Sequence, residues 1–91
     1  MAVKPVTVNA NGTVVPDSVP VKREIDSVKW NGAPNRHRIH FINPPSPFGG
    51  NDFPVPTPEL AVLEGATQGK HYYEVRDLSG AVMADPDVDV E

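Results

Sequence analysis

The chain has 91 residues, including 11 prolines and 7 glycines, and no cysteine. This length suits one domain over residues 1–91, and the absence of cysteine excludes disulfides, CxxC redox sites and thiol nucleophiles. The 8 Lys and Arg against 12 Asp and Glu leave a net charge of −4, which argues against general nucleic-acid binding.

Short strands are expected in the first part of the chain, because the prolines disfavour long helices. Alternating apolar residues predict extended structure at 6–8, 13–15 and 19–21. The Asn-Gly dipeptide at 11–12 predicts a tight turn between the first two segments. Pro20 cannot donate a ladder hydrogen bond, so the third segment is predicted to be an edge or kinked strand.

The clearest strand covers residues 36–42, after a strand at 27–30 and a loop of turn-forming residues. Its side chains alternate between two faces of the expected sheet, and the face with the larger apolar side chains is expected to point into the core. The core-facing set is His37, Ile39 and Phe41, opposite Arg38, His40 and Ile42.

Residues 43–58 hold six of the prolines and form a long connection. Prolines at alternate positions favour an extended, PPII-like backbone without internal hydrogen bonds. Phe48 and Phe53 are expected to pin this connection onto the body of the domain. The alternative is an exposed partner-binding motif that presents Phe48.

The C-terminal third continues the pattern of short segments. Residues 58–63 predict either one helical turn or a short strand, and strands follow at 71–76 and 81–83. The final segment, 87–91, alternates strictly, with its valines expected inward and its carboxylates outward. The whole chain predicts about seven strands with a turn roughly every 8–12 residues, which is typical of an all-β, antiparallel sandwich.

A strand that ends in Trp30 precedes an Asn/Pro loop and the strand segment at 37–41, and the chain closes with segments at 69–75 and 85–90. In this order, and over nearly the whole chain, these features resemble the cupredoxin-like family, which includes plastocyanin and azurin. The resemblance implies a Greek-key β-sandwich that contains both the N-terminal and the acidic C-terminal strand. An immunoglobulin-like ligand-binding module would show much the same strand pattern.

In the cupredoxin-like family, a His at the start of the aromatic-ending strand and a later Cys–His–Met cluster hold copper. The resemblance places His37 at the first position, Val75 at the Cys, Leu78 at the second His and Met83 at the axial Met. Because the thiolate supplies the bond that defines a blue copper site, its replacement by Val implies a fold without metal or other cofactor. The alternative is a degenerate copper-binding or electron-transfer protein that uses His37 and Met83.

Three basic side chains at the clearest strand are the main binding candidates. Spacing by two places Arg36, Arg38 and His40 on one strand face, about 7 Å between neighbours, as an anion-binding stripe. Pairing with Asp or Glu of the same protein is the alternative for these side chains. The sequence has no nucleophile elbow, P-loop or GxGxxG motif, and we expect no enzyme activity.

The expected function is a non-enzymatic, metal-free binding or structural module. It would contact a protein partner, or a second copy of itself, through unpaired strand edges or the Pro-rich connection. No apolar run approaches the roughly 18 residues that span a membrane, and the start of the chain lacks the layout of a secretory signal. We therefore expect no membrane or nucleic-acid partner, and we favour a cytoplasmic location over an exported mature form.

Overall fold

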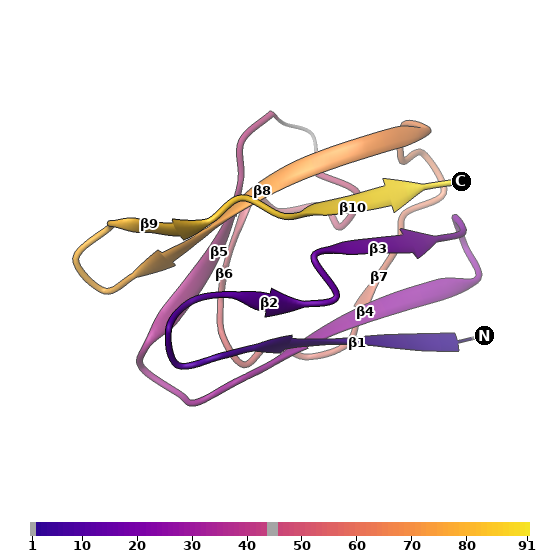
Figure 1. Ribbon diagram of the computed structural model, residues 1–91. Helices are drawn as coiled ribbons and strands as arrows, with labels where there is room; N and C mark the ends of the chain where they lie inside the picture. Colours follow the sequence, from indigo (N-terminus) through magenta and orange to yellow (C-terminus); the bar gives the residue numbers. More distant parts are fainter. Residues whose placement is uncertain (1, 44–45) are drawn as a thin grey trace.

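The computed structural model describes residues 2–43 and 46–91, which form ten strands in two facing sheets (Figure 1). Pro44 and Pro45, part of the predicted connection, lie outside the described residues. Over the described ranges, no helix is long and apolar enough to cross a membrane. The all-β prediction is confirmed, with more strands than expected.

The first sheet has the strand order β2-β1-β4-β7. Its members are β1 (Ala2–Val8), β2 (Val14–Val15), β4 (Asp26–Asn31) and β7 (Leu60–Ala61). The predicted Asn-Gly turn joins β1 to β2: the Gly12 amide donates to the Asn9 carbonyl at 2.9 Å, and Gly12 has a φ of 86°. The segment 58–63 contains the short strand β7 rather than a helical turn.

The second sheet has the strand order β3-β10-β8-β5-β6. Its members are β3 (Ser18–Val21), β5 (His37–Phe41), β6 (Asp52–Pro54), β8 (Gly69–Asp77) and β10 (Asp87–Val90). An additional strand, β9 (Val82–Ala84), pairs with β8 close to its C-terminal end. Pro20 lies in β3 at the edge of this sheet, as predicted.

Both sheets are mixed, which corrects the prediction of an antiparallel sandwich. β1 runs parallel to β4, and β3 runs parallel to β10. The physical reason is that β2 and β3 follow one another in the direction opposite to β1. The chain changes from the first sheet to the second between them, at Pro16 and Asp17. The chain then reverses once more, so β4 runs in the same direction as β1 and lies beside it.

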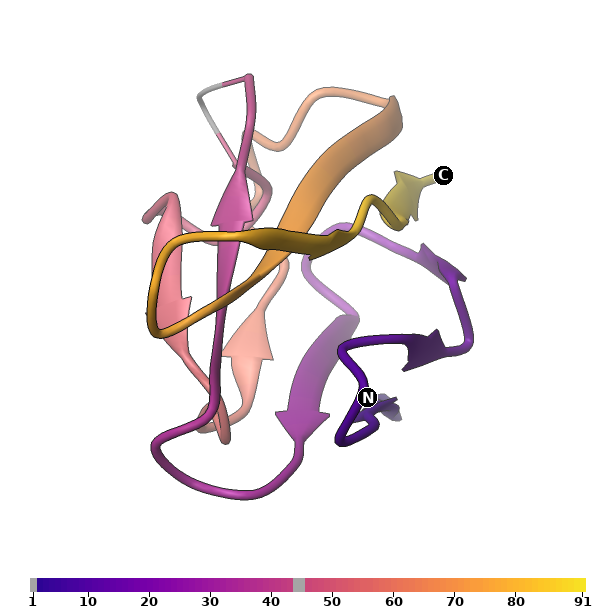
Figure 2. The same cartoon turned by 60° about the vertical axis from the view of Figure 1, so that its left-hand side comes forward.

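The chain changes sheets on both sides of the sandwich, and the outermost strands there are short (Figure 2). On one side it passes from β2 to β3, and on the other from β6 to β7. In the second crossing, the Val55 amide donates to the His37 carbonyl at 3.1 Å and the Thr57 amide to the Trp30 carbonyl at 3.0 Å. The edge strands β2, β3, β6 and β7 have two to four residues each. In the described part of the chain, residues 2–6 of β1 also have no strand partner on the side away from β4, because β2 pairs only with the last two residues of β1.

Aromatic side chains occupy the centre of the core between the sheets. Trp30 makes T-shaped contacts with Phe41, Phe48 and Tyr73, at ring-centroid distances of 6.4, 5.6 and 5.5 Å. The Trp30 Nε1 also donates to the Tyr73 hydroxyl at 3.1 Å. Because Trp30 lies on β4 and Tyr73 on β8, this pair joins the two sheets.

Burial follows the predicted alternation in β5 and at the valines of β10. The buried side chains at these positions are His37, Ile39, Phe41, Val88 and Val90. Asp87 was expected to face water, but it is 9% exposed. The reason for this correction is the neighbouring β3, whose Ser18 hydroxyl donates to Asp87 Oδ1 at 2.7 Å and compensates for the buried charge.

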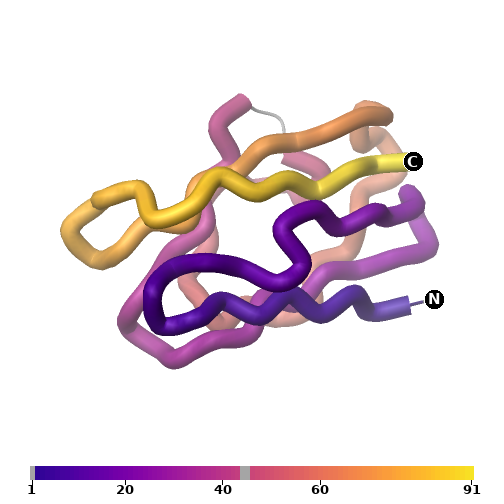
Figure 3. The backbone as a smooth tube through the Cα atoms, viewed as in Figure 1, coloured from indigo at the N-terminus to yellow at the C-terminus, as the bar shows by residue number. Residues whose placement is uncertain are grey.

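The two ends of the sandwich differ in what they carry. Both chain termini lie at one end, because β1 starts beside the start of β4 and β10 ends beside the end of β3. The opposite end carries the β1–β2 turn (9–13), the β4–β5 loop (32–36) and the β8–β9 turn (78–81), as Figure 3 shows. We call this second end the loop end.

Candidate functional site

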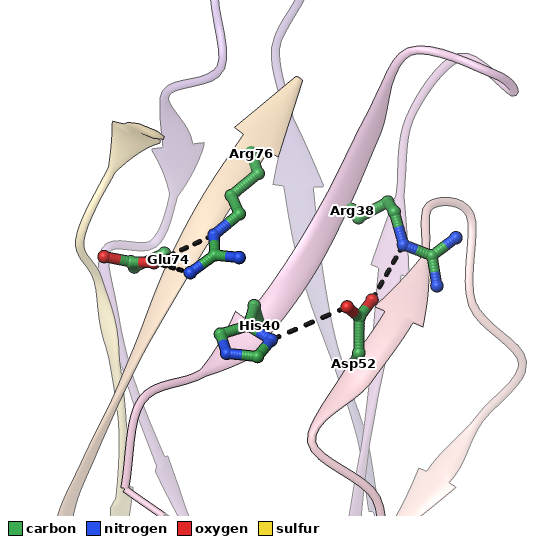
Figure 4. Close-up of polar contacts among 5 residues, drawn as sticks. All are labelled: Arg38, His40, Asp52, Glu74 and Arg76. Atoms are coloured by element: carbon green, nitrogen blue, oxygen red, sulfur yellow. Dashed lines mark hydrogen bonds and ion pairs between the residues drawn. The ribbon is translucent and has the colours of Figure 1, made fainter. Parts of the chain in front are cut away.

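The outer face of the second sheet carries two of the predicted basic candidates (Figure 4). Arg38 Nε donates to Asp52 Oδ1 at 2.8 Å, and His40 Nδ1 lies 3.5 Å from Asp52 Oδ2. The second distance is too long for a good hydrogen bond, and the contact is an ion pair only when the imidazole is protonated. Arg36 lies outside this group, because β5 begins at His37 and Arg36 belongs to the preceding loop. The expected stripe is thus reduced to Arg38 and His40.

The arginines on this face are paired with carboxylates of the same sheet. Arg38 lies directly across the ladder from Arg76, and Arg76 Nε donates to Glu74 Oε1 at 2.9 Å. Each arginine therefore has its own acidic partner, Asp52 or Glu74. Partly exposed pairs of this kind contribute about 0–1 kcal/mol each to stability. The charges on this face largely balance, which leaves little attraction for an external anion.

Phe48 is buried in the aromatic core and presents almost no surface to a partner. It is 9% exposed, and its ring centroid lies 5.6 Å from that of Trp30 and 5.8 Å from that of Phe41. Its amide donates to the Ser46 hydroxyl at 3.1 Å. Phe53 is partly buried against the same core. The described part of the Pro-rich connection is therefore packed onto the domain.

An open pocket of about 410 Å³ lies at the loop end. All three connections of the loop end, together with the strand ends beside them, contribute to its lining. The polar lining residues are Asn35, Arg36, His37, Asp77 and Ser79, and the apolar ones are Ala10, Leu78 and Met83. The fold thus brings together residues from the start, the middle and the end of the chain.

His37 lines this pocket as a buried side chain whose ring has no hydrogen-bond partner among the described residues. It is 6% exposed, and no described residue forms a hydrogen bond with its ring. In the described part of the chain, the fully enclosed polar side-chain atoms without a partner are Ser27 Oγ and His40 Nδ1, and no atom of His37 is among them. The ring nitrogens of His37 therefore reach the solvent of the pocket.

Asp77 lies across the ladder from His37, but its carboxylate is engaged in its own turn. Oδ1 accepts hydrogen bonds from the Ser79 hydroxyl at 2.6 Å, the Ser79 amide at 2.9 Å and the Ala81 amide at 3.0 Å. These hydrogen bonds, led by that of the hydroxyl, lower the pKa of Asp77. The ionised carboxylate thus holds the β8–β9 turn in shape.

Three of the four copper-ligand positions that the family resemblance implies lie at the pocket, and two of these three hold a residue that can bind copper. His37 and Met83 line it, and Leu78 stands at the position of the second His. Val75, placed at the Cys position, is instead fully buried and lies opposite Ile39 in the ladder. Among the described residues, no group of three or more His, Asp or Glu could hold a metal ion. The pocket offers one imidazole and one thioether rather than a full ligand set.

Large apolar side chains are exposed at the loop end, a feature that sequence reasoning missed. Leu78 is 69% exposed, Val82 51% and Met83 40%. The β1–β2 turn packs directly beside Met83, since a Cβ at Gly12 would collide with the Met83 side chain. The available signal was Leu78 itself, an apolar residue directly before the Ser-Gly turn of a hairpin.

A second hollow, of about 490 Å³, lies where the start of β10 meets the crossing from β2 to β3. Its charged lining residues are Asp17, Asp85, Asp87 and Lys70. Asp87 is already bonded to β3 through Ser18, and its amide donates to the Asp17 carbonyl at 2.9 Å. These two hydrogen bonds of Asp87 help to join β10 to β3.

The fold and the loop end define an all-β sandwich protein with an open, partly polar pocket between its loops. No protein-family model matches the chain, and no curated protein matches it. The pocket and the exposed side chains beside it are therefore the observations on which a function is based.

Proposed function

We propose that this protein is a non-enzymatic, metal-free binding module that holds a protein partner at the loop end. One observation carries the proposal: Leu78 and Met83 are exposed and line a pocket that is also lined by buried His37. Contiguous exposed apolar patches are uncommon on monomeric proteins and mark interaction sites. Burial of one such side chain against a partner contributes about 1.5–3 kcal/mol.

The other surfaces considered from the sequence are less suited to a partner. The edge strands have two to four residues, and Pro20 and Pro54 bring no amide donor to them. Phe48 is packed in the core, and the arginines of the outer face are paired with carboxylates. These observations favour the loop end over the edges, over the described part of the Pro-rich connection and over the charged face.

We further propose that the sandwich is a cupredoxin-like Greek key that has lost its copper. The supporting observation is that positions 37, 78 and 83, which the resemblance assigned to copper ligands, line one pocket. Their sequence order alone does not require this, because they come from two different parts of the chain. Val75, at the position of the Cys ligand, is the exception because its side chain is buried in the core. The residue that pairs with His37 across the ladder is Asp77 rather than Val75.

Selection of peptides from a displayed library on the immobilised protein tests the binding function. We expect enriched peptides whose affinity falls about tenfold or more with Leu78→Ser, because a lost apolar contact costs about 1.5–3 kcal/mol. Ile25→Ser is the matched control, since Ile25 is 51% exposed in the turn after β3, away from the loop end. Peptides that bind both variants equally, or a selection without enrichment, would contradict a loop-end site.

A second candidate function is copper binding at a reduced site, which the shared pocket of His37 and Met83 favours. Titration with copper(I), copper(II) and zinc, followed by metal content and histidine NMR signals, tests it. We expect no stoichiometric complex, because the pocket lacks a thiolate. Stoichiometric binding that His37→Ala abolishes and His71→Ala preserves would establish copper binding and overturn the metal-free proposal.

A further inference from the structure

We infer that the loop-end pocket receives the C-terminal carboxylate of a peptide whose last side chain is aliphatic. The inference rests on the proposed binding function and names the chemistry of the partner. Two features of the pocket lead to it: hydrogen-bond donors without a partner among the described residues, and apolar side chains beside them.

Three consecutive residues supply the donors. Asn35, Arg36 and His37 all line the pocket where the β4–β5 loop enters β5. Over the described ranges, the Arg36 guanidinium takes part in no ion pair, and the His37 ring in no hydrogen bond. The buried His37 imidazole contacts only solvent in the pocket, so it gains a hydrogen-bond partner when an acceptor enters.

The sign of the ligand charge follows from Arg36. The protein has a net charge of −4, so an anion needs a local cation that is not already neutralised. Arg36 takes part in no ion pair among the described residues. However, the ionised Asp77, held by hydrogen bonds from Ser79 and Ala81, balances the charge of the guanidinium in the lining, so an anion would be held mainly by directional hydrogen bonds to that group. A planar guanidinium binds a carboxylate through two parallel N–H bonds.

The pocket suits a single negative charge better than a phosphate. A phosphate group carries about −1.5 to −2 charges and is commonly met by a cluster of arginines. Arg36 is the arginine in the lining, and Asp77 adds a negative charge nearby. Because Asp77 repels any anion, a carboxylate with one negative charge is repelled less than a phosphate.

The apolar part of the lining selects the side chain next to the carboxylate. Leu78 and Met83 border the donors, and both are exposed, by 69% and 40%. The volume of about 410 Å³ lies toward the lower end of the roughly 300–1,000 Å³ of ligand sites. It fits the last residue of a chain rather than a folded segment.

Titration of the ¹⁵N-labelled full chain with a short peptide that ends in leucine tests the inference. The same peptide with a C-terminal amide is the comparison ligand. The free-acid peptide is expected to shift the backbone amides of residues 35–37 and 78–83. It is also expected to bind about tenfold or more tightly than the amide, because the amide cannot form the charge-assisted bonds to Arg36.

The small acid 4-methylpentanoate separates a peptide partner from a free carboxylic acid. We expect it to bind more weakly than the peptide, because it lacks the backbone and the preceding residues that also contact the loop end. Affinity equal to that of the peptide would assign the pocket to small carboxylic acids and overturn the peptide as partner.

Arg36→Gln is expected to remove most of the difference in affinity between the free-acid and amide peptides. Arg23→Gln is the matched control, since Arg23 lies in the turn after β3 at the opposite end, and it should preserve the difference. Equal binding of acid and amide, shifts outside the loop end, or no binding of either peptide would overturn the inference. If displayed peptides depend on Leu78 but not on Arg36, the binding function stands and the carboxylate site fails.

Discussion

At the scale of single residues, the hydrogen-bonded pair Trp30 and Tyr73 joins the two facing sheets. The buried indole N–H needs an acceptor, and the Tyr73 hydroxyl provides it at 3.1 Å. Burial raises the pKa of Tyr73 well above its usual value, and the carboxylates of Asp87 and Asp17 raise it further, against the opposing effect of the Trp30 hydrogen bond. The folded protein therefore keeps the neutral phenol.

Tyr73→Phe is expected to lower the free energy of unfolding by about 1–3 kcal/mol, because it leaves the buried Trp30 Nε1 without an acceptor. Urea denaturation followed by tryptophan fluorescence measures this change. Tyr72→Phe is the control, since Tyr72 is 47% exposed and its variant should stay within about 0.5 kcal/mol of the wild type. Similar losses in both variants would show that the inter-sheet hydrogen bond has no special role.

The raised pKa of Tyr73 predicts a loss of stability at high pH. The unfolded tyrosine releases its proton near pH 10, its ordinary value being about 10, whereas the folded protein retains the proton. Above about pH 10 the unfolded state binds fewer protons, so the free energy of unfolding falls by up to about 1.4 kcal/mol per pH unit until the folded pKa is reached. Below pH 10 the contribution is fully present.

Denaturation curves of the wild type and Tyr73→Phe across this pH range isolate the contribution of this one side chain. The free energy of unfolding of the variant should decline less steeply above about pH 10, because phenylalanine has no phenolic proton to release. Parallel declines would mean that other groups account for the alkaline loss of stability.

At the scale of elements, the crossing from β6 to β7 acts as an additional partner for β4. Thr57 is 2% exposed, and its hydroxyl accepts from the Trp30 amide at 3.0 Å and donates to the Pro58 carbonyl at 2.8 Å. Its own amide donates to the Trp30 carbonyl. The crossing thus satisfies both backbone groups of Trp30 next to the two-residue strand β7.

Thr57→Val is expected to lower the free energy of unfolding by about 1–3 kcal/mol, since the buried Trp30 amide would lose its acceptor. The exchange of that amide with solvent deuterium should accelerate, which NMR measures residue by residue. Thr57→Ser retains the hydroxyl and should retain the protection. Loss of protection in both variants would assign the effect to the methyl group rather than to the hydrogen bond.

Individual strands and turns could be predicted because each depends on neighbouring residues. The alternation in β5, the Asn-Gly turn and the edge position of Pro20 follow from side-chain periodicity and backbone chemistry. The parallel pairs could not be predicted, because nothing in Pro16-Asp17 distinguishes an ordinary turn from a crossing between sheets. Asp87 is buried because a serine from a strand far away in the sequence lies beside it.

The candidate site could be predicted only in part for the same reason. His37 was identified from its place at the start of a strand, but its position in a pocket depends on three loops that meet only in the fold. Arg36 was placed on the strand face because β5 was expected to begin one residue earlier. The exposure of Leu78 and Val82 depends on what the rest of the fold leaves uncovered, which local pattern does not contain.

At the scale of the whole molecule, the outermost strands of both sheets are short, and the longer open edge at residues 2–6 of β1 is interrupted by Pro5, which has no amide donor. Such edges offer few aligned donors and acceptors to a second copy. We therefore expect light scattering to give the monomer mass across a wide range of protein concentration. A mass that rises toward twice this value would favour the homo-oligomer considered from the sequence, and its loss in Leu78→Ser would locate the contact at the loop end.

The chain termini lie at the end of the sandwich opposite the pocket (Figure 1). A linker attached to either terminus therefore emerges on the far side from the loops. Copies anchored in this way on a shared carrier would all present their pockets outward. Such an array would gain avidity for clustered peptide ends through effective concentration, by as much as about 10²–10⁴, without any change in the single site.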